Sequence, residues 1–600
     1  MLCFLLCPRP WPCLRPPLPT AYANTHVPAG LSTAVWAAIQ TFLPSTYLKA
    51  SNTEAEDEFG YAVAMSGDTV VVGARLEASN ATGANGNQAN NAADRAGAVY
   101  VFTHTDGVWS QQAYLKASNT DGSDEFGYAV AIDGDTIVVG AYKEASNATE
   151  VNGNQADNSA NSAGAAYVFT RTAGVWSQQA YLKASNAQAV DLFGYAVDIE
   201  GDTIVVGAPL EDSQATAVNG NQNDNSASNA GAAYVFTRTG GVWSQQAYLK
   251  AANAEAGDFF GEQVAIFGDT VVVGVYQEDS QATGVNGDQA NNLAPDSGAA
   301  YVFARTSGVW SQQAYLKASN TEEDDGFGWS VDIDGDLIAV GAVREASQAT
   351  GVDGDQTDNS ASSSGAVYMF SRTAGAWSQQ AYIKASNTEQ ADDFGHAVAL
   401  AGNTLVVGAL FEDSHATGVN GNQTDNSLNA SGAAYVFSHT AGVWSQQAYL
   451  KASNPDEMDL FGAAVAVGDG TVLVGTWREA SNATGVNGDQ TDNSALRAGA
   501  VYLFAPAELA LVVQRVGQGQ VVSEPAGIDC GVVCTADFAP NTVITLTATA
   551  EAGYTFLHWA EGEDVVSTAA SYSFTATAER TLTAHFAADA PKIYLPLVVR

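Results

Sequence analysis

Short hydrophobic segments alternate with polar turns along most of this 600-residue chain, and the alternation has a fixed period. Phe-Gly marks the period, because each step from one copy to the next, such as from Gly60 to Gly127, is 67 residues. The seven copies end at Gly60, Gly127, Gly194, Gly261, Gly328, Gly395 and Gly462. Seven copies without a slip indicate one supersecondary unit used seven times.

Each unit contains four segments with strand character. In the first unit, residues 61–65 alternate, 69–74 form an apolar run, 98–103 alternate again, and 109–116 form a mixed outer stretch. The first two segments are joined by a short turn that contains Gly67, as a tight antiparallel hairpin requires. Each unit is therefore predicted to be a small antiparallel meander.

Seven four-stranded antiparallel units predict an all-β chain that folds into a seven-bladed β-propeller, in which most sheet edges are hidden. A linear solenoid is the alternative, but its end units would be polar caps, and these are not. Residues 45–50 repeat the fourth strand ahead of the first Phe-Gly, whereas the last unit stops after its third strand at 500–504. We therefore expect the N-terminal strand to complete the last blade within a propeller domain at 43–506.

These phrases resemble the FG-GAP repeats of bacterial proteins, which are related to the propeller of the integrin α chain. The resemblance rests on Phe-Gly, Val-Gly-Ala and Gly-Ala-x-Tyr-Val-Phe in register, although only 207–209 spells Gly-Ala-Pro and the alanine is lost at Val275 and Thr476. It implies a propeller that binds ligands. The calcium site that this family carries between the first two strands is not expected here, because turns such as 65–68 are too short to wrap a cation.

A long polar insertion between the second and third strands of every unit follows the pattern Asn/Asp-Gly-Asn/Asp-Gln-x-Asp/Asn-Asn. Hard oxygen ligands at alternating positions are what Ca²⁺ requires, so this loop is a candidate calcium site. The best ligand set is in the fifth unit and the next are in the sixth and seventh, which gives Glu345, Asp353, Asp355, Asp358, Asp425, Asp489 and Asp492. The alternative is that these residues are solvated turns, since Asn, Asp and Gly also imitate backbone hydrogen bonds.

Two acidic positions recur in all seven units. A glutamate precedes each insertion, at Glu77, Glu144, Glu211, Glu278, Glu345, Glu412 and Glu479. An aspartate lies two residues before each Phe-Gly, at Asp57, Asp124, Asp191, Asp258, Asp325, Asp392 and Asp459. Antiparallel order brings the insertions and these aspartates to one face of the ring. The aspartates are then either part of a ligand-binding face or caps of the turns between blades.

A tryptophan stands at one fixed position in six units, from Trp109 to Trp444. Sugar stacking is one interpretation, but we favour packing between blades. The sequence shows no Ser/His/Asp, Cys/His or paired-carboxylate arrangement. A propeller channel can nevertheless assemble an active site that a linear sequence conceals.

Charge narrows the range of partners. Only 23 Lys and Arg stand against 65 Asp and Glu, for a formal net charge of -42. Nucleic acid would be repelled, whereas cations and neutral ligands would not. No stretch approaches the roughly 20 apolar residues of a membrane-spanning helix, so we expect no transmembrane helix.

The C-terminal part, 507–588, has the composition of a small β-domain, with strands expected at 512–522, 542–549, 554–559, 571–575 and 581–586. The phrases at 553–559 and 581–586 resemble the divergent InlB B-repeat of bacterial surface proteins. Cys530 and Cys534 are either a short-loop disulfide or half of a metal site, and the absence of a second thiol pair nearby favours the disulfide. A disulfide implies an oxidising compartment.

The two ends of the chain carry signals that permit more than one interpretation. Residues 1–42 contain a short apolar stretch and a small-residue pattern at 21–23, which is either a poor signal peptide or the product of a misplaced start codon. The tail, 589–600, is either a sorting signal or a final strand.

Together these observations predict a secreted or cell-surface, monomeric, non-catalytic binding or adhesion propeller, which takes a protein or carbohydrate ligand on its loop-bearing face with possible dependence on calcium. The alternative is an extracellular enzyme of the lyase or phospholipase class with its site in the channel.

Overall fold

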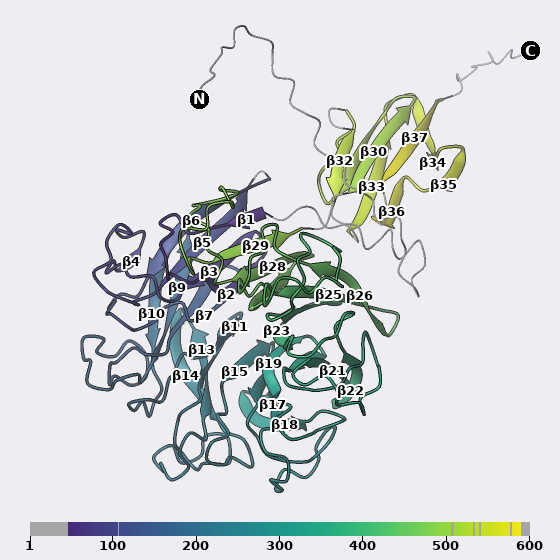
Figure 1. The fold of residues 1–600 in the computed structure, drawn as a ribbon. Coiled ribbons are helices and arrows are strands. Elements are labelled where there is room, and N and C mark those ends of the chain that lie inside the picture. The colour runs from purple at the N-terminus through teal and green to yellow at the C-terminus, as the bar shows by residue number, and fades with distance from the viewer. Residues whose placement is uncertain are drawn as a thin grey trace, which may run out of the picture. The chain divides into compact units, whose positions relative to one another are not determined.

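The computed structural model describes residues 46–105, 107–505, 509–531, 534–538, 542–576 and 579–589. All regular elements in these residues are strands (Figure 1). The candidate signal peptide at 1–42 and the tail at 589–600, apart from its first residue, lie outside the described residues.

Seven sheets of four main strands form the blades of a propeller, one for each 67-residue repeat. Blade 1 contains β2 (Phe59–Ser66), β3 (Thr69–Ala74), β4 (Gly83–Ala84), β5 (Ala98–Thr105) and β6 (Val108–Lys116). Blade 2 contains β7 (Ala129–Asp133), β8 (Thr136–Ala141), β9 (Ala165–Thr172) and β10 (Val175–Leu182). Blade 3 contains β11 (Val197–Glu200), β12 (Thr203–Ala208), β13 (Ala232–Thr239) and β14 (Val242–Leu249).

The remaining blades repeat this order. Blade 4 contains β15 (Gln263–Phe267), β16 (Thr270–Val275), β17 (Ala299–Thr306) and β18 (Val309–Leu316). Blade 5 contains β19 (Phe327–Asp334), β20 (Leu337–Ala342), β21 (Ala366–Thr373) and β22 (Ala376–Ile383). Blade 6 contains β23 (Phe394–Ala401), β24 (Thr404–Ala409), β25 (Ala433–Thr440) and β26 (Val443–Leu450). Blade 7 contains β27 (Ala464–Gly468), β28 (Thr471–Thr476), β29 (Ala500–Phe504) and the N-terminal β1 (Thr46–Leu48).

The ring closes through the N-terminal strand. In blade 7, β1 pairs antiparallel with β29, with Tyr47 opposite Tyr502, so a strand from the start of the chain fills the outermost position of the last sheet. The first strands of the blades contact one another in order, and β27 of blade 7 contacts β2 of blade 1. They surround the centre of the ring, where Figure 1 shows β2, β7, β11, β15, β19 and β23 together.

The Phe-Gly dipeptide joins neighbouring blades. Phe126 is buried, and its ring packs edge-on against Tyr167 and Phe169 at centroid distances of 5.4 and 6.0 Å. The following Gly127 has φ +90, and a Cβ there would lie 2.5 Å from the carbonyl oxygen of Ala98 in the preceding blade. Phenylalanine therefore fills the core between blades, while only glycine permits the close backbone approach beside it.

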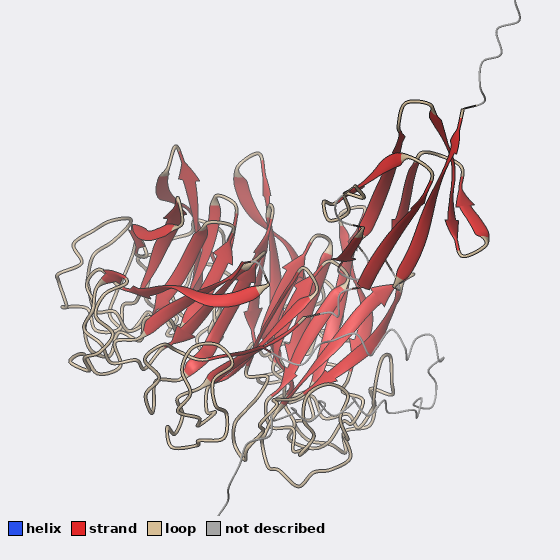
Figure 2. Ribbon diagram, turned by 90° about the horizontal axis from the view of Figure 1, so that it is seen from above, coloured by secondary structure: helices blue, strands red, loops and turns tan. Residues whose placement is uncertain are grey.

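Long and short connections lie at opposite ends of the blades. The turns between the first and second strands are tight, such as residues 67–68, whereas the connections between the second and third strands are long, such as residues 75–97. Figure 2 shows the long loops gathered on one side of the blades. This is the loop-bearing face expected from the antiparallel order of the strands.

The C-terminal module is a small β-domain of two sheets, with strand orders β32-β30-β37-β34-β35 and β31-β33-β36. Its strands are β30 (Leu509–Val516), β31 (Gly519–Glu524), β32 (Thr535–Phe538), β33 (Val543–Ala550), β34 (Tyr554–Glu561), β35 (Asp564–Ser567), β36 (Ser571–Thr575) and β37 (Arg580–Ala588). The single strand expected at 512–522 was wrong. The chain turns at Gly517, which has φ +91, and the two halves join different sheets.

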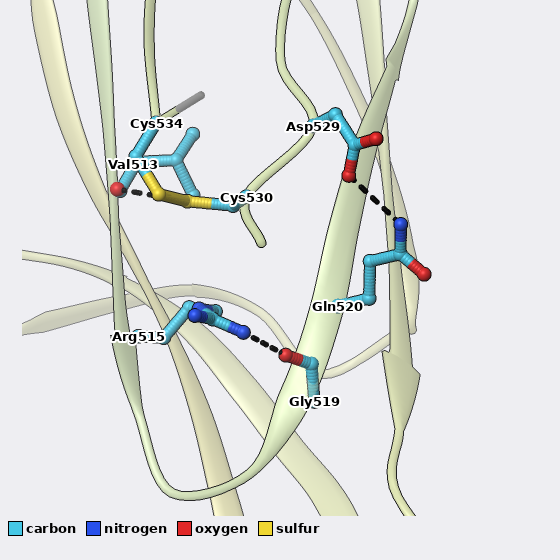
Figure 3. The surroundings of a disulfide bond; sticks show 7 residues. All are labelled: Val513, Arg515, Gly519, Gln520, Asp529, Cys530 and Cys534. Carbon is cyan, nitrogen blue, oxygen red and sulfur yellow. Dashed lines mark hydrogen bonds between the residues drawn. A yellow bond between two sulfur atoms is a disulfide. The ribbon is translucent and has the colours of Figure 1, made fainter. Parts of the chain in front are cut away.

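Cys530 and Cys534 form the disulfide that the sequence favoured. Figure 3 shows it beside β30, where Cys530 Sγ lies 3.3 Å from the carbonyl oxygen of Val513. Cys530 is buried in the core of this module. The bond therefore ties the connection that follows β31 to the core of the module.

Candidate functional site

Glu345, a predicted calcium ligand, lies beneath its loop in a buried hydrogen-bond network. Its carboxylate accepts hydrogen bonds from Lys384 Nζ at 2.9 Å, Tyr382 Oη at 2.8 Å and Asn320 Nδ2 at 3.1 Å. The side chains of Glu345 and Lys384 are 1% and 0% exposed. A carboxylate engaged in this way is not free to coordinate a cation in the loop above it.

The same buried ion pair occurs once in every blade. Nζ–Oε2 distances run from 2.8 Å for Lys451–Glu412 to 3.2 Å for Lys250–Glu211. The lysines are Lys49, Lys116, Lys183, Lys250, Lys317, Lys384 and Lys451. Because an unpaired buried charge is very costly, the glutamate and the lysine require each other. The sequence analysis identified the glutamates but missed the lysines.

The other candidate ligands hold the loop itself. Asp353 has φ +53, and its side chain accepts a hydrogen bond from Tyr382 N at 3.0 Å while its own N donates to Tyr382 O at 2.7 Å. Every other blade has an asparagine in this role, such as Asn219. Asp353 therefore extends the pairing of the outer strand into the loop.

Asp355 and Asp358 are exposed and sit in small turns. Asp355 Oδ1 accepts hydrogen bonds from N and Oγ1 of Thr357 at 3.0 and 2.8 Å, and Asp358 Oδ1 accepts one from Ser360 N at 3.0 Å. Equivalent bonds are made by Asp489, Asp492 and Asp425. Among the described residues, the structure gathers no three acidic, histidine or cysteine side chains at a spacing that would hold a metal ion.

The aspartate two residues before Phe-Gly caps the turn between blades. Asp57 is 6% exposed, and its Oδ2 accepts a hydrogen bond from Glu54 N at 3.0 Å, three residues earlier. Burial, together with the nearby Glu77, raises the pKa of Asp57 to about 8. These aspartates have the geometry of turn caps, the structural alternative considered for them.

The tryptophans pack between blades. Trp176 is 3% exposed, its Nε1 donates to Gln112 Oε1 of the preceding blade at 2.7 Å, and Arg171 stacks on its ring at 5.0 Å. The equivalent Trp243, Trp310, Trp377 and Trp444 are also buried. Packing is therefore the role that the structure gives to these five rings, which are covered and not presented to a sugar.

A pocket of about 490 Å³ opens at the centre of the propeller. The three residues after each Phe-Gly line it, from 61–63 in blade 1 to 463–465 in blade 7, and Arg75, Leu410 and Trp477 complete the wall. In the first blade Phe59 pairs with Ala74, the last residue before a long loop. The pocket therefore lies at the end of the channel that belongs to the loop-bearing face.

The pocket wall has two rings of equivalent positions. The valine ring is the same in all blades and consists of Val63, Val130, Val197, Val264, Val331, Val398 and Val465. The rim, which is the residue directly after each Phe-Gly, differs between blades and consists of Tyr61, Tyr128, Tyr195, Glu262, Trp329, His396 and Ala463. A chain that repeats its scaffold residues faithfully thus places an asymmetric set of side chains around one central cavity.

Family comparison agrees with this architecture. The FG-GAP repeat matches seven times, at residues 46–102, 109–169, 176–236, 243–303, 310–370, 377–437 and 444–504. The chain belongs to the FG-GAP repeat family. Residues 521–590 match the divergent InlB B-repeat domain. No curated protein matches the chain.

The FG-GAP repeats are offset from the blades of the FG-GAP propeller. The repeat at 109–169 begins in β6 of blade 1 and continues through the first three strands of blade 2, and the first repeat begins in β1. Each sequence repeat therefore takes its outer strand from one blade and its inner strands from the next. This overlap explains why the propeller begins with a fourth strand, β1, and ends with a third, β29.

Three polar side chains in the wall of the pocket, Arg75, Glu262 and His396, set its chemistry in this FG-GAP propeller. Arg75 stacks on Tyr61, with its Cζ 3.9 Å from the ring centroid. Glu262 receives a hydrogen bond from Tyr195 Oη at 3.4 Å, and burial raises the pKa of Glu262 to about 7. Burial lowers the pKa of His396 to about 4, so its imidazole is neutral at physiological pH.

Further along the channel, Asp198 and Asp332 stand where the other blades have alanine. Asp198 accepts a hydrogen bond from Ile266 N of the next blade at 2.7 Å, and Asp332 accepts one from Leu400 N at 2.6 Å. Burial raises their pKa values to about 8 and about 7. Each carboxyl therefore bridges two inner strands, and we assign them to the scaffold.

The pocket could not be found from the residue types that all repeats share. The rim residues occupy equivalent positions in the repeat but differ in type, and a search for recurring chemistry passes over them. The signal that could have identified the rim residues is the change of residue type at this one position, directly after a Phe-Gly that is the same in every repeat. The residue after the second strand, Arg75 in blade 1 and Trp477 in blade 7, varies in the same way.

Proposed function

We propose that this protein is an extracellular binding propeller whose ligand seats in the central pocket of the loop-bearing face. The observation that carries the proposal is the asymmetric rim around a uniform valine ring. Ligand pockets are characteristically apolar cavities with a few placed polar groups, and this one has aromatic walls with Glu262, His396 and Arg75 among them.

Location outside the cell is part of the proposal. It is supported by the disulfide between Cys530 and Cys534, because disulfides persist in oxidising environments. No helix in the described part of the chain is long and apolar enough to cross a membrane. Attachment to a surface and the oligomeric state stay predictions from the sequence.

Calcium dependence also stays a prediction. The exposed carboxylates of Asp355, Asp358, Asp489 and Asp492 and the half-buried one of Asp425 are its remaining candidates, although each already accepts a hydrogen bond within its loop. A cation could replace those bonds only if it were coordinated by several oxygens at once.

An enzyme of the lyase or phospholipase class is the second candidate. Glu262 favours it, since a carboxyl group with a pKa of about 7 suits acid–base catalysis. Against it, Glu262 and His396 stand on blades 4 and 6 with Trp329 of blade 5 between them. Incubation with polysaccharides and phospholipids, followed by analysis for released products, tests this candidate.

The experiment that tests the binding proposal is a glycan and extracellular-matrix array, run in calcium and in chelator. The matched variant is Ala463→Trp, which adds a large ring to the one rim position that has only a methyl group. We expect the wild-type protein to bind at least one ligand class, and the variant to lose at least ten-fold in affinity with an unchanged melting temperature. Equal binding by both proteins would place the ligand elsewhere, and a signal identical in calcium and chelator would remove calcium from the proposal.

A further inference from the structure

The positive charge in the pocket wall is already paired with protein carboxylates. Among the described residues that line the pocket, Arg75 is the one permanent cation. Its Nε donates to Glu58 Oε2 at 2.6 Å, and its Nη1 lies 3.6 Å from Glu125 Oε2. An anionic ligand would therefore compete with two protein carboxylates for this guanidinium.

The carboxyl group of Glu262 in the pocket wall has no such partner of opposite charge among the described residues. Glu262 Oε2 is buried and has no hydrogen-bond partner among the described residues, and Oε1 is 3.4 Å from the hydroxyl of Tyr195. No arginine or lysine contributes to the charge environment of this carboxyl group. A buried carboxylate without a cation is costly, and a positively charged ligand would remove that cost.

Aromatic rings stand on both sides of Glu262. Tyr195 occupies the rim position of the preceding blade and Trp329 that of the following blade. Behind Trp329 lies Tyr276, with the ring centroids 4.9 Å apart. Aromatic faces attract cations, and a ring of them beside a carboxylate is a known way to hold an alkylated ammonium group.

The rest of the pocket suits an alkylated cation better than a hydrated metal ion. The valine ring offers an apolar surface for methyl or methylene groups. His396, whose ring lies 5.8 Å from that of Trp329, is neutral at physiological pH and does not repel positive charge. The net charge of -42 raises the local concentration of cations around the whole molecule.

We propose that Glu262, Tyr195 and Trp329 bind an organic ammonium group, either a protonated amine or a quaternary ammonium, in the central pocket. This inference rests on the proposed binding function and names the chemical class of the ligand. The ammonium group takes the place of the missing partner of Glu262, its alkyl groups contact the valine ring, and Trp329 covers one side of it. The group could belong to a small molecule or to a side chain of a larger ligand.

The test compares choline with 3,3-dimethylbutan-1-ol, a neutral compound of the same shape, by isothermal titration calorimetry with the full chain at pH 7.5 and constant ionic strength. We expect choline to bind at least ten-fold more tightly than the alcohol. Glu262→Gln should weaken choline binding at least ten-fold, and Trp329→Ala several-fold. Glu457→Gln makes the same change of charge at an exposed position outside the pocket and should leave binding unchanged.

The outcomes distinguish failure of the ammonium inference from failure of the pocket function. Equal affinity for choline and the alcohol, or no loss in Glu262→Gln when its melting temperature is unchanged, overturns the ammonium inference. Binding of acetate in place of choline also overturns it. If choline fails while an array ligand binds wild type and not Ala463→Trp, the pocket function stands and the ligand class is wrong. If neither binds, both proposals fall.

Discussion

The aspartate two residues before each Phe-Gly couples folding to pH. Burial, with the nearby Glu412, raises the pKa of Asp392 to about 8, and burial raises those of its equivalents to about 7 or about 8. Between about pH 4 and these values the folded state holds protons that the unfolded chain has released. The free energy of unfolding therefore falls as pH rises through this window, by up to about 1.4 kcal/mol per pH unit for each group.

Asp392→Asn should remove the contribution of one such group. The amide oxygen can still accept the hydrogen bond from Glu389 N, and it cannot ionise. We expect the variant to exceed wild type in melting temperature by a small amount at pH 5, about one unit into this window, and by more at pH 8.5. The control is Asp392→Ala, which loses the acceptor and should be less stable at pH 5. A variant no more stable than wild type at pH 8.5 would show that this carboxyl group is ionised at little cost.

Residue types were predictable where every repeat agrees, but their roles were not. Glu345 was identified from its repetition and interpreted as a metal ligand, because its partner Lys384 lies 39 residues later and only the fold brings the two together. Repetition alone cannot distinguish a buried ion pair from a coordination site. The cap role of Asp57 was available as an alternative, because the chemistry of a turn is local.

At the scale of elements, β1 holds the ring closed. Tyr47 of β1 and Lys49, the residue directly after β1, join the buried network of blade 7, where Lys49 Nζ donates to Glu479 Oε2 at 2.9 Å and Tyr47 Oη donates to Glu479 Oε1 at 2.9 Å. Without this strand, β29 would have an open edge and Glu479 would be a buried carboxylate without its cation.

Deletion of residues 1–50 should therefore lower the melting temperature strongly. Loss of the buried partner alone corresponds to about 3–5 kcal/mol, and the lost strand adds to it. The control is deletion of residues 1–40, which retains β1 and should have a small effect. Thermal melts followed by circular dichroism make the comparison. Equal midpoints for the longer deletion and for wild type would show that closure does not depend on β1.

The strands of the propeller were predictable from the alternating hydrophobic positions and from the glycine turns. Because each strand recurs in seven copies, a pattern that is ambiguous in one copy is clear in the others. The C-terminal module had no such redundancy. There, β32 and β35 were not predicted, since each has only four residues and no clear alternation. The turn at Gly517 was concealed by valines on both sides of it, which resemble one continuous strand.

At the scale of the whole molecule, the repeats form a scaffold and their differences form the site. The valine ring, the Phe-Gly junctions and the buried Lys–Glu pairs are the same around the ring, whereas the rim carries five residue types in seven blades. If the shared residues hold the fold and the rim residues bind the ligand, mutation of the rim alone should abolish binding and leave the fold intact.

The most direct test makes the rim uniform. Glu262→Tyr, Trp329→Tyr, His396→Tyr and Ala463→Tyr, combined in one protein, give every blade the tyrosine of blades 1 to 3, whose rings already contact one another in tilted pairs at centroid distances of 5.2 and 4.9 Å. Wild type and the uniform variant are compared on the same array of glycans and matrix proteins. The account predicts an unchanged melting temperature together with loss of the wild-type binding signal. Equal binding by both proteins, or a variant that does not fold, would contradict it.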